Sequence, residues 1–115
     1  MGAWVYVRGW LEFYGQRSQA ERAIRDGGDP AGWTFPDGGW LEAACYARAV
    51  RASALDDLLD LVRRIAALPA ADEDGDRVCG LFLAFQEGDG QSEWQVRDGE
   101  VFVGPAAPRH DYLWK

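Results

Sequence analysis

The chain has 115 residues, of which 48% are hydrophobic and 27% are charged, and its formal net charge is −7. This apolar fraction excludes a disordered chain, and the length predicts one domain over residues 1–115. The negative charge disfavours direct binding to nucleic acid or to an anionic membrane surface. No apolar run approaches the roughly 20 residues that span a bilayer, and no signal peptide is recognisable. A cytoplasmic protein with reduced Cys45 and Cys79 is therefore expected.

The first elements predicted are a strand and a short helix. Residues 4–14 alternate between apolar and polar side chains, which is typical of a strand, and Gly9 inside it indicates a bulge. Ser18 and Glu21 have the spacing of a capping box at a helix start. Gly27 then predicts a left-handed end to that helix.

Residues 27–40 contain seven glycines and prolines, which predicts a long loop. The segment also carries Trp33, Phe35 and Trp40, and long loops in compact domains are commonly functional. We therefore predict Trp33 and Trp40 as anchors of a protein interface, because aromatic residues dominate such interfaces. The alternative is that these rings fold back and cover an edge of the core.

A strand is predicted over residues 41–51, in which Cys45, Ala47 and Ala49 share one face. These small side chains indicate that a helix packs closely over that face. The following helix is predicted from an apolar stripe with i, i+3, i+4 spacing, with Ser53 as its cap and Pro69 beyond its end.

The last predicted elements are strands. Residues 78–87 are apolar at both parities, which indicates a central strand. Residues 92–97 and 100–103 form a hairpin across Asp98-Gly99, a type I′ signal. The predicted fold is α+β, with a mainly antiparallel five-stranded sheet and two helices packed on one face, in the order β-α-β-α-β-β-β.

The negative charge is unevenly distributed, since residues 54–100 sum to −8 and the remainder to about neutrality. Such a one-sided field speeds association with a basic partner. The acids predicted to contact that partner are Asp72, Glu73, Asp74, Asp76, Glu87 and Asp89. The alternative is that the acids only keep the protein soluble.

Catalytic and metal-binding patterns are weak. His110 beside Asp111 is the single histidine, and no G-x-S-x-G nucleophile motif accompanies it. The acids from Asp72 to Asp76 resemble the start of a calcium loop, but Arg77 and Leu83 stand where Gly and Glu are required. The sequence therefore predicts no enzyme, no cofactor and no metal site.

Three short motifs occur in a recognisable order. The first strand carries Gly9-Trp10, a later strand reads Gly80-Leu81-Phe82, and an acidic turn leads to the hairpin of residues 94–101. This order resembles a family of small acidic immunity proteins of bacterial polymorphic-toxin systems, which typically open with a His-Gly-Trp strand.

Two features depart from the family pattern. Arg8 stands where the family usually has His, and the tail lacks the proline-bounded run of the family, having only Pro105 and Pro108. The resemblance implies a non-enzymatic protein that binds and neutralises a cognate toxin domain. The sequence leaves both a monomer and a homodimer open. Many such toxins are basic nucleases, to which an acidic surface is complementary.

Two other classes of function stay open. One is a small-molecule-binding or regulatory α+β domain, which a pocket between sheet and helices at the 27–40 loop would favour. The other is a small enzyme that uses clustered carboxylates and His110, which a carboxyl with a raised pKa in a cleft would favour.

Overall fold

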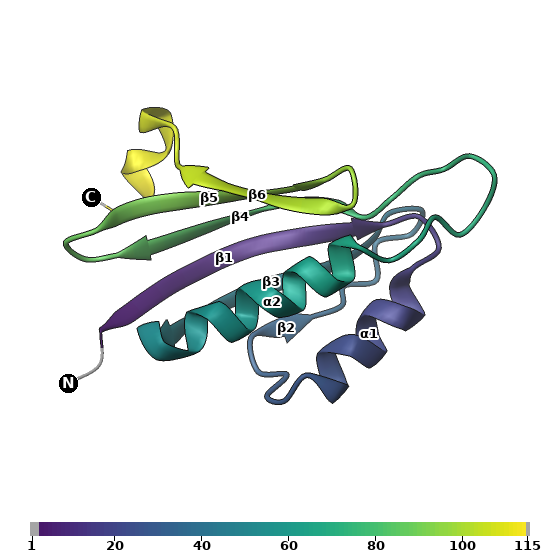
Figure 1. The fold of residues 1–115 in the computed structure, drawn as a ribbon, viewed down its shortest axis with the longest axis horizontal. Coiled ribbons are helices and arrows are strands. Elements are labelled where there is room, and N and C mark those ends of the chain that lie inside the picture. Colours follow the sequence, from purple (N-terminus) through teal and green to yellow (C-terminus); the bar gives the residue numbers. More distant parts are fainter. Residues whose placement is uncertain (1–2, 115) are drawn as a thin grey trace.

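The computed structural model describes residues 3–114. Within them, a six-stranded antiparallel sheet has the strand order β2-β3-β1-β4-β5-β6 (Figure 1). In chain order, the elements are β1 (Trp4–Phe13), α1 (Arg17–Asp26), β2 (Trp33–Thr34), β3 (Glu42–Arg51), η1 (Ala52–Ala54), α2 (Leu55–Ala66), β4 (Cys79–Gln86), β5 (Gly90–Arg97), β6 (Glu100–Pro105) and η2 (Pro108–Leu113), where η marks a 3-10 helix.

The predicted α+β class with an antiparallel sheet is confirmed, but the predicted number of five strands is wrong. The sixth strand is β2, inside the segment predicted as a loop, where Trp33 pairs with Tyr46 and Thr34 with Cys45. Gly32 precedes it with φ +94°, a conformation that lets the chain turn into the pairing. The Trp33 ring then packs edge-on against Tyr46, at 4.8 Å between centroids.

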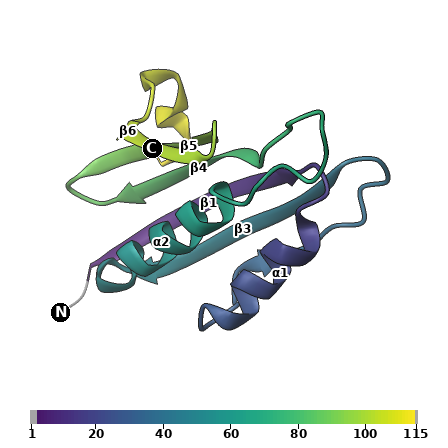
Figure 2. The ribbon, with the colours of Figure 1, turned by 45° about the vertical axis from the view of Figure 1, so that its right-hand side comes forward.

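The two α-helices lie on one side of the sheet (Figures 1 and 2). We call that side the helix-covered face and the other side the open face. On β1 the predicted alternation is confirmed, because Val5, Val7, Leu11 and Phe13 are all buried. These four side chains belong to the hydrophobic core between the sheet and the helices. The other elements contribute further core side chains, including Ile24, Val62, Ile65, Phe82, Trp94 and Val96.

Gly9 does not form the predicted bulge. The register runs without interruption from Gly9↔Tyr46 to Trp10↔Cys45, so no extra residue is present. A Cβ at Gly9 would instead lie 2.5 Å from the Phe82 ring and from the Leu81 carbonyl oxygen. Glycine is therefore needed here because the Phe82 ring lies directly over the strand.

The helix ends also differ from prediction. Glu21 forms an i, i+4 ion pair with Arg17 at 2.9 Å, and no side chain caps the start of α1. Gly27 has φ −81°, and the left-handed residue is the next one, Gly28, with φ +112°. Ser53 lies within η1 and does not cap α2.

Gln16 is the buried polar residue that joins three segments at one end of the sheet. Its Oε1 accepts a hydrogen bond from the Tyr14 backbone N–H at 2.7 Å. Its Nε2 donates to the carbonyl oxygens of Asp76 at 2.9 Å and Pro69 at 3.5 Å. This side chain therefore ties the start of α1 to the loop that follows α2.

The predicted hairpin is confirmed. Asp98 has φ +55° and Gly99 has φ +78°, the two positive values that a type I′ turn requires.

Candidate functional site

The open face carries aromatic and aliphatic side chains on neighbouring strands. Trp10 lies between Cys45 and Leu81 in the register, and four residues away along β1, Tyr6 pairs with Phe85. Trp10 is 41% exposed and Tyr6 is 47% exposed, so neither belongs to the core.

The orientation of β3 overturns one prediction. Cys45, Ala47 and Ala49 lie on the open face, and no helix covers them, because their neighbours Tyr46 and Val50 are the ones buried under the helices. The larger side chains bury more apolar area, and that area decides which face is covered. The prediction that residues 78–87 form a central strand is confirmed, because β4 lies between β1 and β5. Its side chains on the open face are only half-buried: Leu81, Leu83 and Phe85.

Residues 106–114, which we call the C-terminal segment, lie on one end of the open face (Figure 1). The Trp114 ring stacks on Phe85 with 4.7 Å between centroids and 14° between planes. Arg8 Nη1 donates to the Leu113 carbonyl oxygen at 3.1 Å, and Gln91 Nε2 donates to the His110 carbonyl oxygen at 3.3 Å. One aromatic stack and a few hydrogen bonds therefore hold the segment in place.

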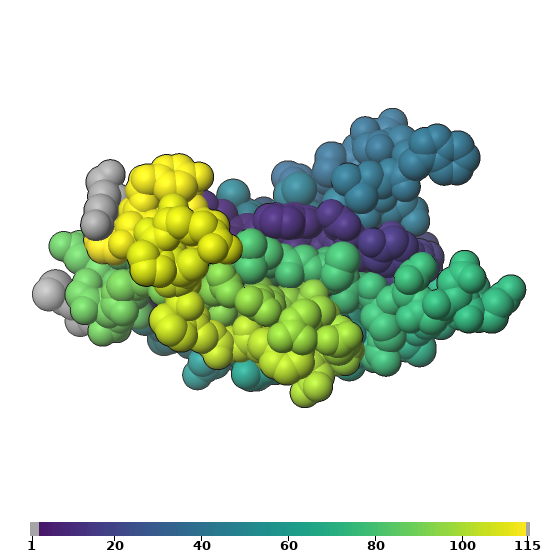
Figure 3. Space-filling model, turned by 90° about the horizontal axis from the view of Figure 1, so that it is seen from above, coloured from purple at the N-terminus to yellow at the C-terminus, as the bar shows by residue number. Residues whose placement is uncertain are grey.

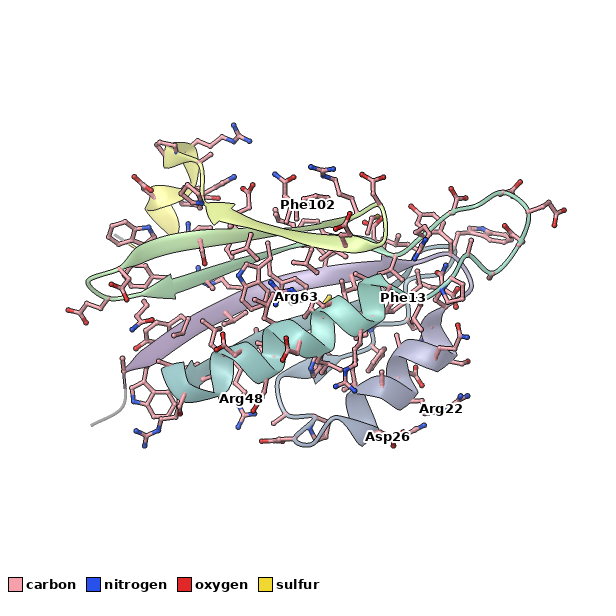
Figure 4. The ribbon with its side chains drawn as sticks, viewed as in Figure 1. Phe13, Arg22, Asp26, Arg48, Arg63 and Phe102 are labelled. Carbon is pink, nitrogen blue, oxygen red and sulfur yellow. The ribbon has the colours of Figure 1, made fainter. Side chains whose placement is uncertain are left out.

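Two further rings on this face are covered by arginines. The Arg97 guanidinium lies 4.1 Å from the centroid of the Phe102 ring, on the side of β6 away from α2 (Figure 4). The Arg51 guanidinium lies 4.5 Å from the centroid of Trp4. These cation–π contacts orient rings that are still partly exposed.

The two tryptophans predicted as interface anchors occupy different environments. Trp33 is half-buried on the helix-covered face, 4.8 Å from Tyr46 and 6.1 Å from Phe82 between centroids, and packs with the core. Trp40 is fully exposed, in a turn where the Leu41 N–H donates to the Gly38 carbonyl oxygen at 3.1 Å. The space-filling view shows β1 in purple between this protruding blue loop and the yellow C-terminal segment (Figure 3).

The six predicted acids are exposed, but they do not form one patch. Asp72, Glu73, Asp74 and Asp76 lie in the loop before β4, and Glu87 and Asp89 lie in the turn after it. The eight residues of β4 separate the two groups by about 27 Å at the usual rise per residue. The acids therefore border the open face at its two ends.

Glu12 organises the end of the open face nearest the first acidic group. Its Oε1 accepts a hydrogen bond from Trp10 Nε1 at 3.3 Å, which holds the indole ring. Its Oε2 accepts from Cys79 Sγ at 3.7 Å. Burial raises the pKa of the Cys79 thiol, and the negative charge of Glu12 raises it further. Cys79 is therefore held as a thiol, not as a nucleophilic thiolate.

The residues that a small enzyme would use, His110 and the clustered carboxylates, lie in the following surroundings. His110 lies in η2, next to a turn, and its backbone carbonyl is the group bonded to Gln91. The pKa of Asp29 is lowered by hydrogen bonds from the Ala31 backbone N–H and from Arg48, opposite to the shift of a general acid. Among residues 3–114, no three His, Cys, Asp or Glu side chains are grouped so that they could hold a metal ion.

A cavity of about 280 Å³ lies on the helix-covered face, where the 27–40 loop meets α2. Trp33, Tyr46 and Leu58 line its apolar part. Its charged lining residues are Asp29, Arg48 and Asp57, of which the first two bind each other at 2.9 Å. The volume is slightly below the range usual for ligand pockets.

None of the five side chains that cluster on the open face was predicted as a site residue: Tyr6, Trp10, Leu81, Leu83 and Phe85. A signal for them was present, because two predicted strands carry large apolar side chains at both parities. When such strands are neighbours and helices cover only one side, the second apolar set is left in solvent.

Comparison with models of known protein families found no match, and neither the curated proteins nor the solved structures gave a significant match. Among the residues described, no helix has the length and apolar character needed to cross a membrane.

Proposed function

We propose that this chain is a non-enzymatic binding protein that neutralises a basic toxin domain, and that it docks through the open face of its sheet. The observation that carries the proposal is the cluster of partly exposed apolar side chains on β1 and β4, on the side of the sheet opposite α1 and α2. Exposed apolar patches on soluble domains typically mark interaction sites. The short motifs that resemble those of immunity proteins indicate that the partner is a toxin domain.

The expected partner is basic because of the charges around this face. Asp72 to Asp76 border one end, and Glu87 and Asp89 border the other. On the face itself, Arg8 donates to the Leu113 carbonyl, Arg97 binds Asp98, and Arg51 lies over the Trp4 ring. Acidic borders around an apolar centre resemble the polar rim and apolar core of protein interfaces, and they speed association with a basic surface.

The cavity beside Trp33 favours a second function, binding of a small molecule. Its apolar walls and position between sheet and helices fit that class. Of its three charged lining residues, Asp29 and Arg48 bind each other, and Asp57 adds a second carboxylate to the lining. Because the cavity is slightly smaller than is usual for ligand pockets, the open face supports protein binding better than this cavity supports ligand binding.

The experiment begins with capture of a partner from a lysate of the source organism at low salt. The captured protein is then purified and its affinity is measured for the parent chain and for Leu83→Arg, which places a charge in the centre of the open face. Gln19→Arg is the matched control, because Gln19 is exposed on α1 and the added charge is the same. We expect Leu83→Arg to weaken binding at least tenfold and Gln19→Arg to leave it unchanged.

Neutralisation is tested separately. The partner expressed alone should arrest growth of a bacterial host, and co-expression of the parent chain or of Gln19→Arg should restore growth. Leu83→Arg should fail to restore it. Equal affinity of both variants for the partner would show that the open face is not the docking surface, and a partner that does not arrest growth would remove the toxin from the proposal.

A further inference from the structure

The centre of the open face is hollowed. A depression of about 390 Å³ lies between β3, β1 and β4, with walls from Arg8, Trp10, Cys45, Leu81 and Leu83. It exists because the residues of β3 paired with Trp10 and Arg8 are small, namely Cys45 and Ala47. The larger side chains of β1 and β4 therefore lie beside a space that none of residues 3–114 fills.

The walls of the hollow are apolar except for Arg8, and its largest wall is held in place. The Trp10 indole is fixed by its hydrogen bond to Glu12 at 3.3 Å. A ring that is already oriented loses little freedom when a partner stacks on it, so less of the binding free energy is lost to ordering.

The C-terminal segment shows what the neighbouring part of this face binds. Its Trp114 ring stacks on Phe85, and the carbonyl oxygen of the preceding residue, Leu113, accepts a hydrogen bond from Arg8. Arg8 lies between Tyr6, which pairs with Phe85, and Trp10, which lines the hollow. The same guanidinium therefore borders both the occupied position and the vacant one.

We infer that the hollow is the anchor site of the docking surface, and that it receives one aromatic side chain of the partner protein. A backbone carbonyl beside that side chain accepts a hydrogen bond from Arg8. This inference rests on the function proposed above. An aromatic ring fits because it can stack on Trp10 and contact Leu81 and Leu83, as aromatic anchors do at the centres of interfaces. A lysine or arginine of a basic partner would instead place its charge beside Arg8.

The occupant is a side chain of a protein, because the hollow is a shallow depression in the sheet surface that opens widely to solvent. A free small molecule would bury only one side there, whereas a partner that covers the rest of the open face also excludes water from the other side.

The test uses N-acetyl-L-tryptophanamide, which carries the ring and the carbonyl groups of one anchor residue. It is titrated into the full ¹⁵N-labelled chain, and amide chemical shifts are recorded. We expect saturable shifts with a dissociation constant on the order of 1–10 mM, as befits one isolated residue. They should be largest at Arg8, Trp10, Leu81 and Leu83. N-acetylglycinamide, which lacks the ring, should give no saturable shifts.

Two variants sharpen the test. Arg8→Ala should weaken binding of the probe several-fold. Leu83→Arg should abolish the amide shifts that the probe causes, while Gln19→Arg should leave these shifts unchanged. The inference is overturned if the largest shifts occur around the cavity beside Trp33, or if no saturable shifts occur at 20 mM, roughly twice the weakest expected constant.

The inference and the proposed function can fail separately. If the probe does not bind the hollow but Leu83→Arg still weakens the protein partner, the open face is a docking surface without this anchor. If the probe binds the hollow but Leu83→Arg leaves the partner affinity unchanged, the hollow is not where the partner docks, and both proposals fail.

Discussion

The two faces of the sheet are built from the same strands, but α1 and α2 cover one face and leave the other largely exposed. On β4, Phe82 is fully buried under the helices, while the next residue, Leu83, is half-exposed on the open face. On β1, Val7 is buried and its neighbours Tyr6 and Arg8 are exposed. Alternate residues of one strand therefore serve the core and the surface.

The difference between the faces shows that apolar composition does not by itself define a core. The helix-covered face is closed by α1 and α2 and by the rings that pack beneath them, and its polar side chains are few. The open face has similar apolar residues on its central strands, but Arg8, Glu93 and Gln95 lie among them on the same parity. A mixed surface of this kind suits a partner that binds after folding.

The largest expected difference in stability between the two faces is between the adjacent residues Phe82 and Leu83 of β4. Phe82→Ala should lower the free energy of unfolding by about 3–5 kcal/mol, because it removes a ring at the centre of the core. Leu83→Ala should lower it by less than about 1 kcal/mol, because that side chain already meets solvent. Urea unfolding of the two variants measures both values. Equal losses would mean that the open face is as much a part of the folded core as the other face.

Much of the fold followed from the sequence because it depends on local patterns. The alternation of β1, the amphipathic stripe of α2 and the Asp98-Gly99 turn each fix an element over a few residues. The choice of covered face on β3 did not follow, because it depends on which strands become neighbours. Cys45 and Ala47 are compatible with a helix above them, and only the larger area of Tyr46 and Val50 settles the matter.

The candidate site was less predictable than the fold. Trp40, which the composition of its loop singled out, is exposed but is not among the side chains of the open face. Trp33, from the same loop, packs against Tyr46 because β2 adds to the sheet edge, a pairing between distant segments. The hollow could not be read from the sequence, because it arises where small residues of one strand meet large residues of another.

A glycine pair tests how closely the helix-covered face is packed. Gly9→Ala should lower the free energy of unfolding by about 2–3 kcal/mol, because its Cβ would meet the Phe82 ring and the Leu81 carbonyl. Gly104→Ala on β6 is the control, since nothing lies within 4 Å of the added Cβ. Thermal or urea unfolding should show almost no loss for the control. A similar loss in both variants would indicate a backbone effect rather than close packing.

Gln16 tests whether the end of the sheet is held by polar contacts in place of apolar ones. Gln16→Ala should cost about 1–2 kcal/mol, because the Tyr14 N–H and the Asp76 carbonyl lose their buried partner. Hydrogen exchange should accelerate in residues 69–78 more than in β5. Uniform acceleration across the chain would show that Gln16 supports the whole fold and not this junction.

The smallest effect concerns protonation at the edge of the open face. Burial raises the pKa of Cys79, so the folded chain holds the thiol proton more tightly than the unfolded chain, where a thiol titrates near 8.5. The resulting stability is present below the unfolded pKa and is lost as the pH rises through the folded pKa. In a Cys45→Ala background, the rate of Cys79 alkylation should therefore rise at higher pH in the folded chain than in urea.

Tyr14→Phe should move the pH profile of Cys79 alkylation in a defined direction. The hydroxyl of Tyr14 lies 4.0 Å from Cys79 Sγ, and this contact lowers the thiol pKa against the effect of burial. Removing it should move the alkylation profile of the folded chain to still higher pH and leave the profile in urea unchanged. A shift to lower pH would mean that the Tyr14 hydroxyl accepts a hydrogen bond from the Cys79 thiol and so favours the protonated form, opposite to the direction expected here.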